Sequence, residues 1–372
     1  MTALPPRPDL SRPLAPHVVE VPDAFVIPKS RGLRDTPTQH SGVLRADGSL
    51  VPESILWRGL DRVTLDPVPP RDGLEDRLKG RWLYMGVLFG HFGHFLMESV
   101  SRVWALPAWR GRIDGVVFHP KDNHRTEQLM EEYRPLLYAL GIDVPVHLVT
   151  EPTRVDRLVV PPQGFGMFDM AEGAPEFRDY LRGPVAASVP PLGPEKLYIS
   201  RTALNPKRGA LVGEHELERR LVAEGYVPFH PQDHHHLVQI ARYRAAKKIV
   251  CMDCTPLHLL ALVGNASQTV GVIARREGDF AAMFERQIGR FLGARVGAID
   301  VLVRNWSKPG KTRTDRNSWG EPDFAALGAA LRDLGLIEAE RWAPLSESHR
   351  RESLDRAEAA NAHPMEPIRP AA

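Results

Sequence analysis

Apolar runs and amphipathic segments alternate in a regular way through the second half of the chain. The short strand-like runs, which are mainly apolar, lie at 197–199, 226–229, 248–251 and 268–273. The segments with helical spacing lie between them, at 214–224, 236–246 and 257–263. Strands that alternate with helices of about ten residues are typical of a parallel sheet built from βαβ units. In such a sheet, ligands bind at the carboxyl ends of the strands.

The first half of the chain repeats this alternation. Apolar runs predict strands at 82–88, 115–118, 146–149 and 157–160. Helical spacing predicts helices at 93–106 and 126–140. We therefore predict the α/β fold class for the whole protein.

Breaks in the apolar pattern divide the chain into five parts. A proline-rich, irregular segment is expected at 1–42, and a first α/β domain at 43–183. Residues 184–195 are mostly proline, glycine and small residues, which is typical of a linker between domains. A second α/β domain is expected at 196–305. Residues 306–372 are expected to form a helix at 322–334 and, over about the last fifteen residues, a disordered tail.

Composition excludes several classes of protein. The chain of 372 residues is long enough for two domains, and 43% hydrophobic and 25% charged residues are typical of a globular protein. The 48 basic and 46 acidic side chains nearly balance, so we expect no nucleic-acid partner. No apolar run approaches the roughly 20 residues that span a bilayer, and the N-terminus has no apolar signal region. We therefore expect a cytoplasmic protein without a transmembrane segment, and peripheral association with the inner membrane stays open.

One candidate site lies where the run at 248–251 meets the following helix. Thr255 is a good N-cap, and Pro256 suits the first turn of a helix. A helix start exposes N–H groups and a partial positive charge, so a diphosphate can dock there. His258, about one turn further on, could reach a phosphate or a sugar hydroxyl. The alternative is an ordinary capped helix with a histidine that faces the core.

Arginines are expected at the same edge of the sheet. Arg201 and Arg208 follow the first strand of the second half, and Arg275 and Arg276 follow the fourth. A forked guanidinium suits phosphate, although single arginines at strand ends are usually solvated. Their convergence predicts an anion site in which Arg201, Arg208 and Thr255 lie close together.

A second candidate site lies at 90–102. If this segment is helical, His91, His94 and Glu98 share one face. Glu98, four residues after His94, could then hold the imidazole in one tautomer and stabilise its cation, which makes a general base. The same residues could instead bind a metal, although the spacing differs from the usual zinc-binding helix. Packed histidines with a purely structural role are the other alternative.

Two further patterns have ordinary explanations. Cys251 and Cys254 have the spacing of a redox pair, but Cys251 lies in an apolar strand and the chain is too large for a small redox domain. The run His234 to His236 could bind a metal, but a solvated helix start explains it better. The chain has no Asp-x-Asp pair of the kind that holds a divalent ion on a nucleotide, which favours chemistry without a metal.

Several of these motifs, in this order, resemble glycosyltransferase family 61. The segment 90–102 resembles the family signature Asn/His-x-x-His-Phe/Trp-Leu-x-Glu-x-x-x-Arg. The motifs similar to the second half of the family are Tyr198-Ile199-Ser200-Arg201, Arg208, Glu214-x-Glu216-Leu217, Gln239-Ile240 and Leu257-His258. The resemblance covers roughly residues 80 to 275. The bacterial branch, which is associated with capsular and other surface polysaccharides, fits best.

This resemblance implies two Rossmann-like domains that face each other across a cleft, in a GT-B-like architecture. It implies an inverting reaction without a metal or other cofactor, with a nucleotide-sugar donor, often UDP-linked, and a glycan acceptor. The residues it places at the donor are Ser200, Arg201, Arg208, Asp253, Thr255 and His258. His94 and Glu98 would be catalytic and would face the acceptor, with His91 and Arg102 also on the acceptor side.

The chain departs from the family pattern at two positions. Cys254 stands where the family usually has a glycine, which puts a thiol near the expected diphosphate. Gly213 stands where an asparagine is common. Besides the active transferase, two functions stay open. One is a catalytically impaired relative that binds a nucleotide or a glycan, and the other is a metal-dependent hydrolase that uses His91, His94 and Glu98.

Overall fold

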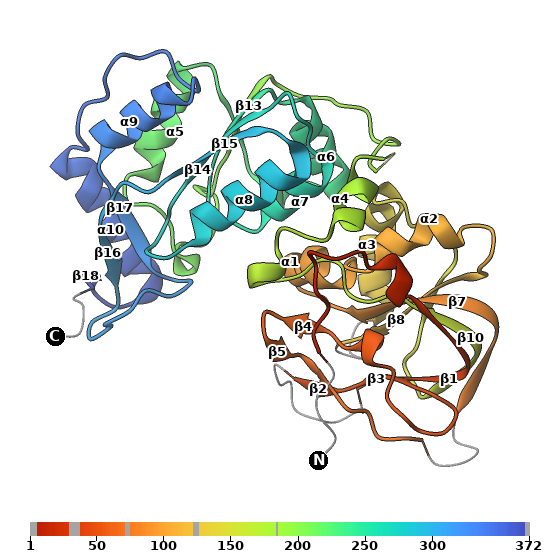
Figure 1. Ribbon diagram of the computed structural model, residues 1–372. Helices are drawn as coiled ribbons and strands as arrows, with labels where there is room; N and C mark the ends of the chain where they lie inside the picture. The colour runs from red at the N-terminus through yellow and green to blue at the C-terminus, as the bar shows by residue number, and fades with distance from the viewer. Residues whose placement is uncertain (1–5, 30–37, 71–74, 122–125, 184, 369–372) are drawn as a thin grey trace. The chain divides into compact units, whose positions relative to one another are not determined.

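The computed structural model describes residues 6–29, 38–70, 75–121, 126–183 and 185–368. The chain forms two compact units, Met1–Ser188 and Val189–Ala372. Each unit has its own sheet with parallel strands, so the predicted α/β class is confirmed (Figure 1). The division falls within the segment 184–195, of which residue 184 lies outside the described residues. Within the described part of the chain, no helix has the length and apolar character needed to cross a bilayer.

The first unit contains a mixed sheet with the strand order β3-β1-β10-β7-β8-β9. Its strands are β1 (Val19–Ile27), β3 (Gly42–Leu44), β7 (Asp76–Leu88), β8 (Gly115–Pro120), β9 (Val146–Leu148) and β10 (Thr153–Val160). The strands β10, β7, β8 and β9 are parallel, whereas β1 is antiparallel to both β10 and β3. The four apolar runs predicted as strands in this half all lie in the sheet.

Strand β1 differs from the irregular segment expected at 1–42. Its residues Val21, Ala24 and Val26 are almost fully buried, so this strand belongs to the core. Pro22 cannot donate a ladder hydrogen bond, which weakens the strand signal in the sequence. The structure accommodates it because β1 pairs only with β10 at that point and meets β3 later, at residues 25–27. Residues 1–5 and 30–37 of the expected segment lie outside the described residues.

The helix predicted at 93–106 is broken into short turns. It consists of α1 (Phe92–His94), a π-helical turn (Phe95–Ser99), a 3-10 turn (Val103–Ala105) and α2 (Leu106–Trp109). A polar side chain competes with the helical ladder here, since Ser101 Oγ donates to the Glu98 carbonyl. Ser99 Oγ accepts from the Phe89 amide and so ties the π-helical turn to the end of β7. The longer helices of this unit are α3 (Thr126–Ala139) and α4 (Pro175–Leu181).

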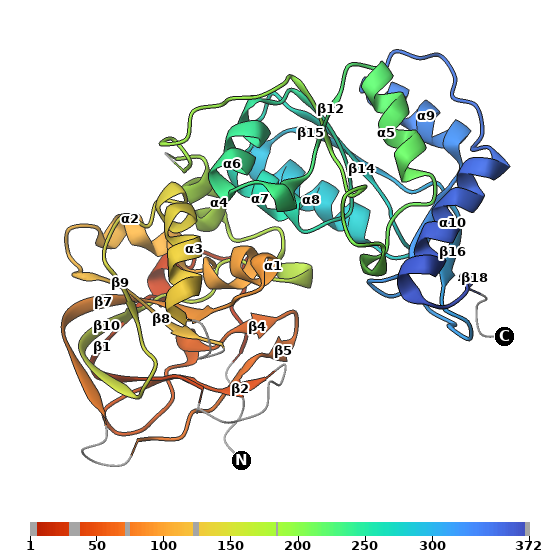
Figure 2. The same cartoon turned by 180° about the vertical axis from the view of Figure 1, so that it is seen from behind.

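The second unit contains a five-stranded parallel sheet with the order β12-β11-β13-β14-β15. Its strands are β11 (Lys196–Ile199), β12 (Val227–Phe229), β13 (Lys248–Met252), β14 (Thr269–Ile273) and β15 (Arg295–Ile299). In both views α6 (His236–Ala245), α7 (Pro256–Val263) and α8 (Phe280–Leu292) cover one face (Figures 1 and 2). The other face carries α5 (Glu214–Ala223) and α9 (Phe324–Asp333). The four strands and three helices predicted from the apolar pattern are all confirmed.

The second unit extends well beyond residue 305, where the sequence suggested that the domain ends. Helix α9 packs Leu327 and Leu331 into the same core as Tyr198 and Val250 of the sheet. The chain continues with β16 (Leu302–Ser307), β17 (Trp319–Pro322), α10 (Glu347–Asn361) and β18 (Glu366–Pro367).

The ordered end of the chain also differs from the disordered tail expected for about the last fifteen residues. Helix α10 buries Leu354 and Ala357, and these side chains pack with Met365 and Trp319. The alanine-rich, charged sequence of α10 conceals this narrow apolar stripe. Residues 369–372 of the expected tail lie outside the described residues.

Candidate functional site

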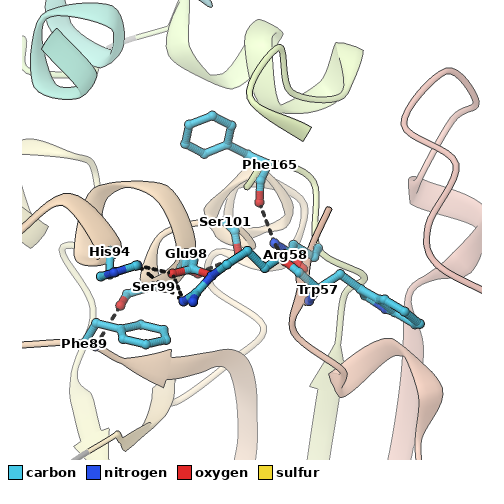
Figure 3. A network of polar contacts seen from close by, with 9 residues as sticks. Trp57, Arg58, Phe89, His94, Glu98, Ser99, Ser101 and Phe165 are labelled. Atoms are coloured by element: carbon cyan, nitrogen blue, oxygen red, sulfur yellow. Dashed lines mark hydrogen bonds and ion pairs between the residues drawn. The ribbon is translucent and has the colours of Figure 1, made fainter. Parts of the chain in front are cut away.

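His94 and Glu98 lie on the short helical segment of the first unit and contact each other. His94 ends α1, and Glu98 lies in the π-helical turn that follows. Turns of this kind are often found at functional sites. His94 Nδ1 is 2.6 Å from Glu98 Oε2 (Figure 3). The Glu98 side chain is fully buried, whereas one third of the His94 side chain is exposed. The predicted side-chain pairing is therefore present in the structure.

Arg58, which the sequence did not single out, binds the same carboxylate. It lies on β4 (Trp57–Arg58), the first strand of a short hairpin with β5 (Asp61–Arg62). Its Nε donates to Glu98 Oε1 at 3.0 Å and its Nη2 donates to Glu98 Oε2 at 2.9 Å (Figure 3). This forked geometry is the strong form of an arginine–carboxylate contact. Nothing in the local sequence around Arg58 signals it, because its partners come from a distant segment.

The three side chains together determine the tautomer of His94. Arg58 Nη2 is 3.4 Å from His94 Nδ1, but a guanidinium can only donate and Glu98 is the acceptor beside that nitrogen. The network therefore assigns the proton of a neutral His94 to Nδ1, where it is donated to Glu98. The other ring nitrogen, Nε2, is then the one that can accept a proton.

Gln163 holds the backbone next to Arg58. Its Oε1 accepts from the Trp57 amide at 2.8 Å, and its Nε2 donates to the Trp57 carbonyl at 3.1 Å and to the Phe165 carbonyl at 2.9 Å. Gln163 is fully buried. Because the backbone N–H and C=O of Trp57 are both fixed in this way, the backbone that leads into Arg58 is fixed too.

Arg102 is not on an acceptor surface, as the family resemblance implied, but inside the first unit. It is fully buried and donates to the carbonyls of Ile55 at 2.8 Å, Glu53 at 3.0 Å and Pro161 at 3.0 Å. Burial lowers the pKa of Arg102 to about 10. A Cβ at Gly86 would lie 2.7 Å from Arg102 Nη1, so this position needs glycine. Arg102 thus holds together the segments around the candidate site and is not available to a ligand.

His91 lies beside His94. It is exposed at the N-cap position of α1, and the two rings meet edge to face with centroids 5.2 Å apart. These histidines and Glu98 are the set that could hold a metal. However, both oxygens of Glu98 already accept hydrogen bonds from Arg58 or His94. The carboxylate is therefore engaged with its protein partners.

The second unit has a topological switch point between β11 and β13. From β11 the chain crosses to β12 on one side, and from β12 it returns to β13 on the other side. Ligands of open α/β sheets bind outside the carboxyl ends of the strands at such a point. Ser200 and Arg201 follow β11, and Asp253 follows β13, so these three predicted residues are at the expected edge.

Arg201 is tied to the loop that carries Arg208. Its backbone N–H donates to Glu214 Oε1 at 2.7 Å, and its Nη2 donates to the carbonyls of Arg208 at 3.1 Å and Gly209 at 3.0 Å. The Arg208 side chain itself is exposed. The two residues are thus joined through the backbone and not by adjacent guanidinium groups. Among the described residues, no hydrogen bond joins either arginine to Thr255.

Ser200 is also engaged within the protein. Its hydroxyl donates to Glu218 Oε2 at 2.5 Å and lies 2.9 Å from Thr202 Oγ1. Ser200 is almost fully buried. A phosphate could bind this hydroxyl only if Glu218 moved away.

The start of α7 differs from the capped helix predicted at Thr255. Thr255 has a right-handed helical conformation and makes no side-chain cap hydrogen bond. The amides of Leu257 and His258 donate to the carbonyls of Cys254 and Thr255, both at 3.0 Å. Because these amides are already bonded, the helix start offers fewer donors to an anion than the sequence suggested.

His258 faces the core, which is the alternative left open by the sequence. It is 7% exposed, its Nδ1 is 3.0 Å from Gln287 Oε1, and its ring lies 4.7 Å from that of Phe284. Both partners lie on α8. Cys254, also buried, stays a neutral thiol at neutral pH because burial raises its pKa to about 12. Its sulfur therefore adds no negative charge near the strand ends.

Arg275 and Arg276, which follow β14, converge on Asp253. Arg275 Nε is 3.3 Å from Asp253 Oδ1, and Arg276 Nε is 4.0 Å from Asp253 Oδ2. Burial raises the pKa of Asp253 while the neighbouring arginines oppose this change, and burial lowers the pKa of Arg275 to about 10. Within the described residues, both Asp253 oxygens and the Nε atoms of Arg201, Arg275 and Arg276 lack a hydrogen-bond partner. This edge of the sheet thus contains several buried polar atoms that remain unsatisfied.

Two cavities accompany these residues. A cavity of about 20 Å³ beside Arg201 and Glu214 has room for roughly one water molecule. A groove of about 730 Å³ begins at Glu277, directly after Arg276, and is lined mainly by polar residues that include Asn305, Thr312 and Arg313. Of these two, the groove has the size of a small-molecule site, which is about 300–1,000 Å³.

The fold and the site define a mixed α/β protein with a doubly wound parallel sheet, compatible with the α/β folds of glycosyltransferases. Residues 92–262 match the family model described as Glycosyltransferase 61, over a little less than half of the chain. This match supports the resemblance to that family and supports a glycosyltransferase. The matched segment contains His94, Glu98 and Asp253 but not Arg58 or Arg275. No curated protein matches the chain.

Proposed function

We propose that this protein is an inverting glycosyltransferase that moves a sugar from a nucleotide-sugar to a hydroxyl of a glycan acceptor. The network of His94, Glu98 and Arg58 is the observation that carries the proposal. A UDP-linked donor, a reaction without a metal, and a role in capsular or other surface polysaccharide synthesis are further parts of it. They rest on the family resemblance.

In this proposal His94 is the general base. Its Nε2 takes the proton of the acceptor hydroxyl as that oxygen attacks the anomeric carbon, and the bond to the leaving diphosphate breaks on the opposite face. Glu98, which accepts the Nδ1–H, stabilises the imidazolium that forms. A positioned base of this kind contributes a factor of about 10² to 10⁴ to a rate. Arg58 keeps the carboxylate oriented toward the ring.

The donor would bind at the carboxyl ends of β11, β13 and β14. Arg201, Arg275 and Arg276 supply positive charge there, and this preorganised charge would stabilise the diphosphate as it leaves. The unsatisfied Nε atoms of these arginines support this part of the proposal. Asp253, which holds Arg275, would position it or accept a hydrogen bond from a ribose hydroxyl. Ser200, Thr255 and His258 would contribute less to donor binding. Ser200 and His258 have polar partners within the protein, and Thr255 makes no cap hydrogen bond.

A GT-B-like arrangement, with the base on one unit and the donor on the other, completes the proposal. Closure of two such units excludes water and protects a reactive donor from hydrolysis. The expected site of action is the cytoplasm or its face of the inner membrane, where nucleotide-sugars are available.

The decisive experiment replaces His94 with alanine and measures transfer from a panel of UDP-sugars to mixed glycan acceptors. We expect a loss of about 10²-fold or more in kcat, with the affinity for UDP unchanged in calorimetry. Turnover equal to that of the wild-type protein would end the assignment of the base. Transfer that EDTA abolishes and Mn²⁺ restores would instead favour metal-assisted chemistry.

A catalytically impaired relative is the second candidate function. The observations that favour it are the engaged Ser200 hydroxyl, the absent cap at Thr255, and Cys254 in the place of the family glycine. Such a protein would bind UDP or a glycan without transfer. Calorimetry with UDP, combined with the transfer assay, separates the two functions. If UDP does not bind at all, both are weakened.

A further inference from the structure

Phe168 combines a strained backbone with an exposed aromatic ring. It begins a 3-10 turn, Phe168–Met170, with a φ of +60°, a region that residues with a Cβ rarely adopt. Its side chain is 58% exposed. Neither the strained conformation nor the exposed ring favours folding. Strain of this kind persists where surrounding contacts impose it, and it is concentrated at ligand-binding sites.

The loop that carries Phe168 runs along the hairpin that carries Arg58. At one end of this loop, Gln163 binds the backbone N–H and C=O of Trp57. At the other end, the Phe168 ring covers Gly59, since a Cβ on Gly59 would lie 3.3 Å from Phe168 Cδ2. Arg58 lies between these two contacts. Its side chain contacts Glu98 and His94, so the ring borders the residue that adjoins the proposed base.

Arg7 fixes these two segments to each other. Its Nη1 donates to the Gly59 carbonyl at 3.1 Å and forms an ion pair with Asp169 Oδ2 at 2.6 Å. Leu60, at the tip of the hairpin, is 82% exposed. Leu60 directly follows Gly59, the residue that the Phe168 ring covers, so two exposed apolar side chains lie on adjoining segments. We call this pair the Leu60–Phe168 platform.

We propose that the Leu60–Phe168 platform is an acceptor subsite that binds a neutral pyranose ring of the acceptor glycan. The C–H face of a pyranose is apolar and packs on an aromatic face, while its hydroxyls remain in water. Aromatic side chains give a binding surface with little loss of conformational entropy. The inference rests on the proposed function, because it takes the acceptor hydroxyl to lie at His94. An acceptor of more than one sugar would contact the platform with one ring and present the hydroxyl of another to the base.

The test uses saturation-transfer NMR of the full chain with cellobiose, lactose, maltose and methyl β-D-glucopyranoside. We expect at least one of these sugars to bind the wild-type protein and to bind Phe168→Ala at least ten-fold more weakly, with binding restored in Phe168→Trp. Tyr138→Ala is the matched control, because Tyr138 is also an aromatic residue of the first unit that is 58% exposed. It should leave binding unchanged. Equal binding by wild type and Phe168→Ala, or no binding of any sugar to the wild type, would overturn the subsite.

Two further measurements separate the subsite from its alternatives. Phe168→Gly accepts the positive φ without strain, so its melting temperature should be equal to or above that of the wild type. A fall of more than about 5 °C would show that the ring serves packing and would overturn the proposal. Binding of the wild type, but not of Phe168→Ala, to phosphatidylglycerol vesicles without any effect of Phe168 on sugar binding would assign the platform to a membrane instead.

Kinetics distinguish a failure of the subsite from a failure of the proposed function. If transfer occurs, Phe168→Ala should raise the acceptor KM at least ten-fold and change kcat less than two-fold. An unchanged acceptor KM would remove the subsite and leave the transferase in place. The protein could instead show no transfer and still bind a sugar in a way that depends on Phe168 and persists in His94→Ala. That result would support the subsite and contradict the transferase function.

Discussion

Arg58 and Glu98 are 40 residues apart in the chain and are joined by two hydrogen bonds, from Nε to Oε1 at 3.0 Å and from Nη2 to Oε2 at 2.9 Å. One residue comes from a two-residue strand and the other from a π-helical turn. The positive charge of Arg58 balances the negative charge of the fully buried Glu98 carboxylate. The two bonds also fix the orientation in which the carboxylate meets His94. The proposed base is therefore a set of three residues and not the pair visible in the sequence.

Replacement of Arg58 should lower kcat more than it changes the donor KM. Arg58→Gln removes both hydrogen bonds to Glu98, and displacement of a catalytic group by about 1 Å can cost about 10²-fold in rate. Arg58→Lys should give a smaller loss, because a lysine keeps the charge but not the fork. The measurement is steady-state transfer kinetics on variants whose circular dichroism matches the wild type. Arg81→Gln, which removes an ion pair with Glu20 in the same unit, is the control. A kcat for Arg58→Gln within two-fold of the wild type would refute the role of Arg58.

The same contact should be visible in stability. Glu98→Gln removes the negative charge that pairs with the Arg58 guanidinium and one of its two acceptor oxygens, and we expect a loss of about 2 kcal/mol in the free energy of unfolding. In a double-mutant cycle with Arg58→Gln, the coupling energy should be about 1 kcal/mol or more. The exposed pair Arg110 and Asp143 is the matched control, and its coupling should be below about 1 kcal/mol. Urea denaturation of the full chain measures both double-mutant cycles, since all four residues lie in the first unit. Equal coupling energies for the two pairs would contradict the prediction.

Nucleotide binding should depend on Arg275 more than on Arg208. Arg275 is buried beside Asp253 with an unsatisfied Nε, whereas Arg208 is exposed. We expect Arg275→Gln to weaken UDP binding at least ten-fold, about 1.4 kcal/mol, and Arg208→Gln to weaken it less than about three-fold. Isothermal calorimetry on both variants is the measurement. If Arg208→Gln weakened UDP binding more than Arg275→Gln, the donor site would lie beside Arg208 and Thr255, as the sequence suggested.

Glu214 should make the second unit less stable as the pH rises. Burial raises its pKa from 4.5 to about 7, although the nearby Arg201 opposes this change. Between these two values the folded protein binds more protons than the unfolded chain, so the free energy of unfolding falls as the pH increases. The fall amounts to about 3 kcal/mol, and Glu214→Gln should lack it. Urea denaturation of both proteins at pH 5, 6, 7 and 8 tests this, and a constant difference between them would count against the raised pKa.

Most of the sheet of the second unit could be predicted because its signals are local. The segments 197–199 and 249–252 are continuous apolar runs, and the end of α5 is followed by a glycine, Gly225, with a φ of +86°. Strand β1 and helix α10 were not predicted, because their local signals in the sequence are weak. Pro22 interrupts the first, and the apolar stripe of the second is only Leu354 and Ala357, so that tertiary contacts decide both elements.

For the candidate site, the sequence by itself determined the pairing of His94 with Glu98, because a spacing of four residues brings them together on any helical turn. It also determined that Arg201 and Asp253 lie at the same sheet edge, since parallel strands end on one side. Only the tertiary structure decided that Arg58 joins the pair, that Arg102 is buried, and that His258 faces α8. These depend on contacts between distant segments, whose free energies do not appear in any local pattern of residues.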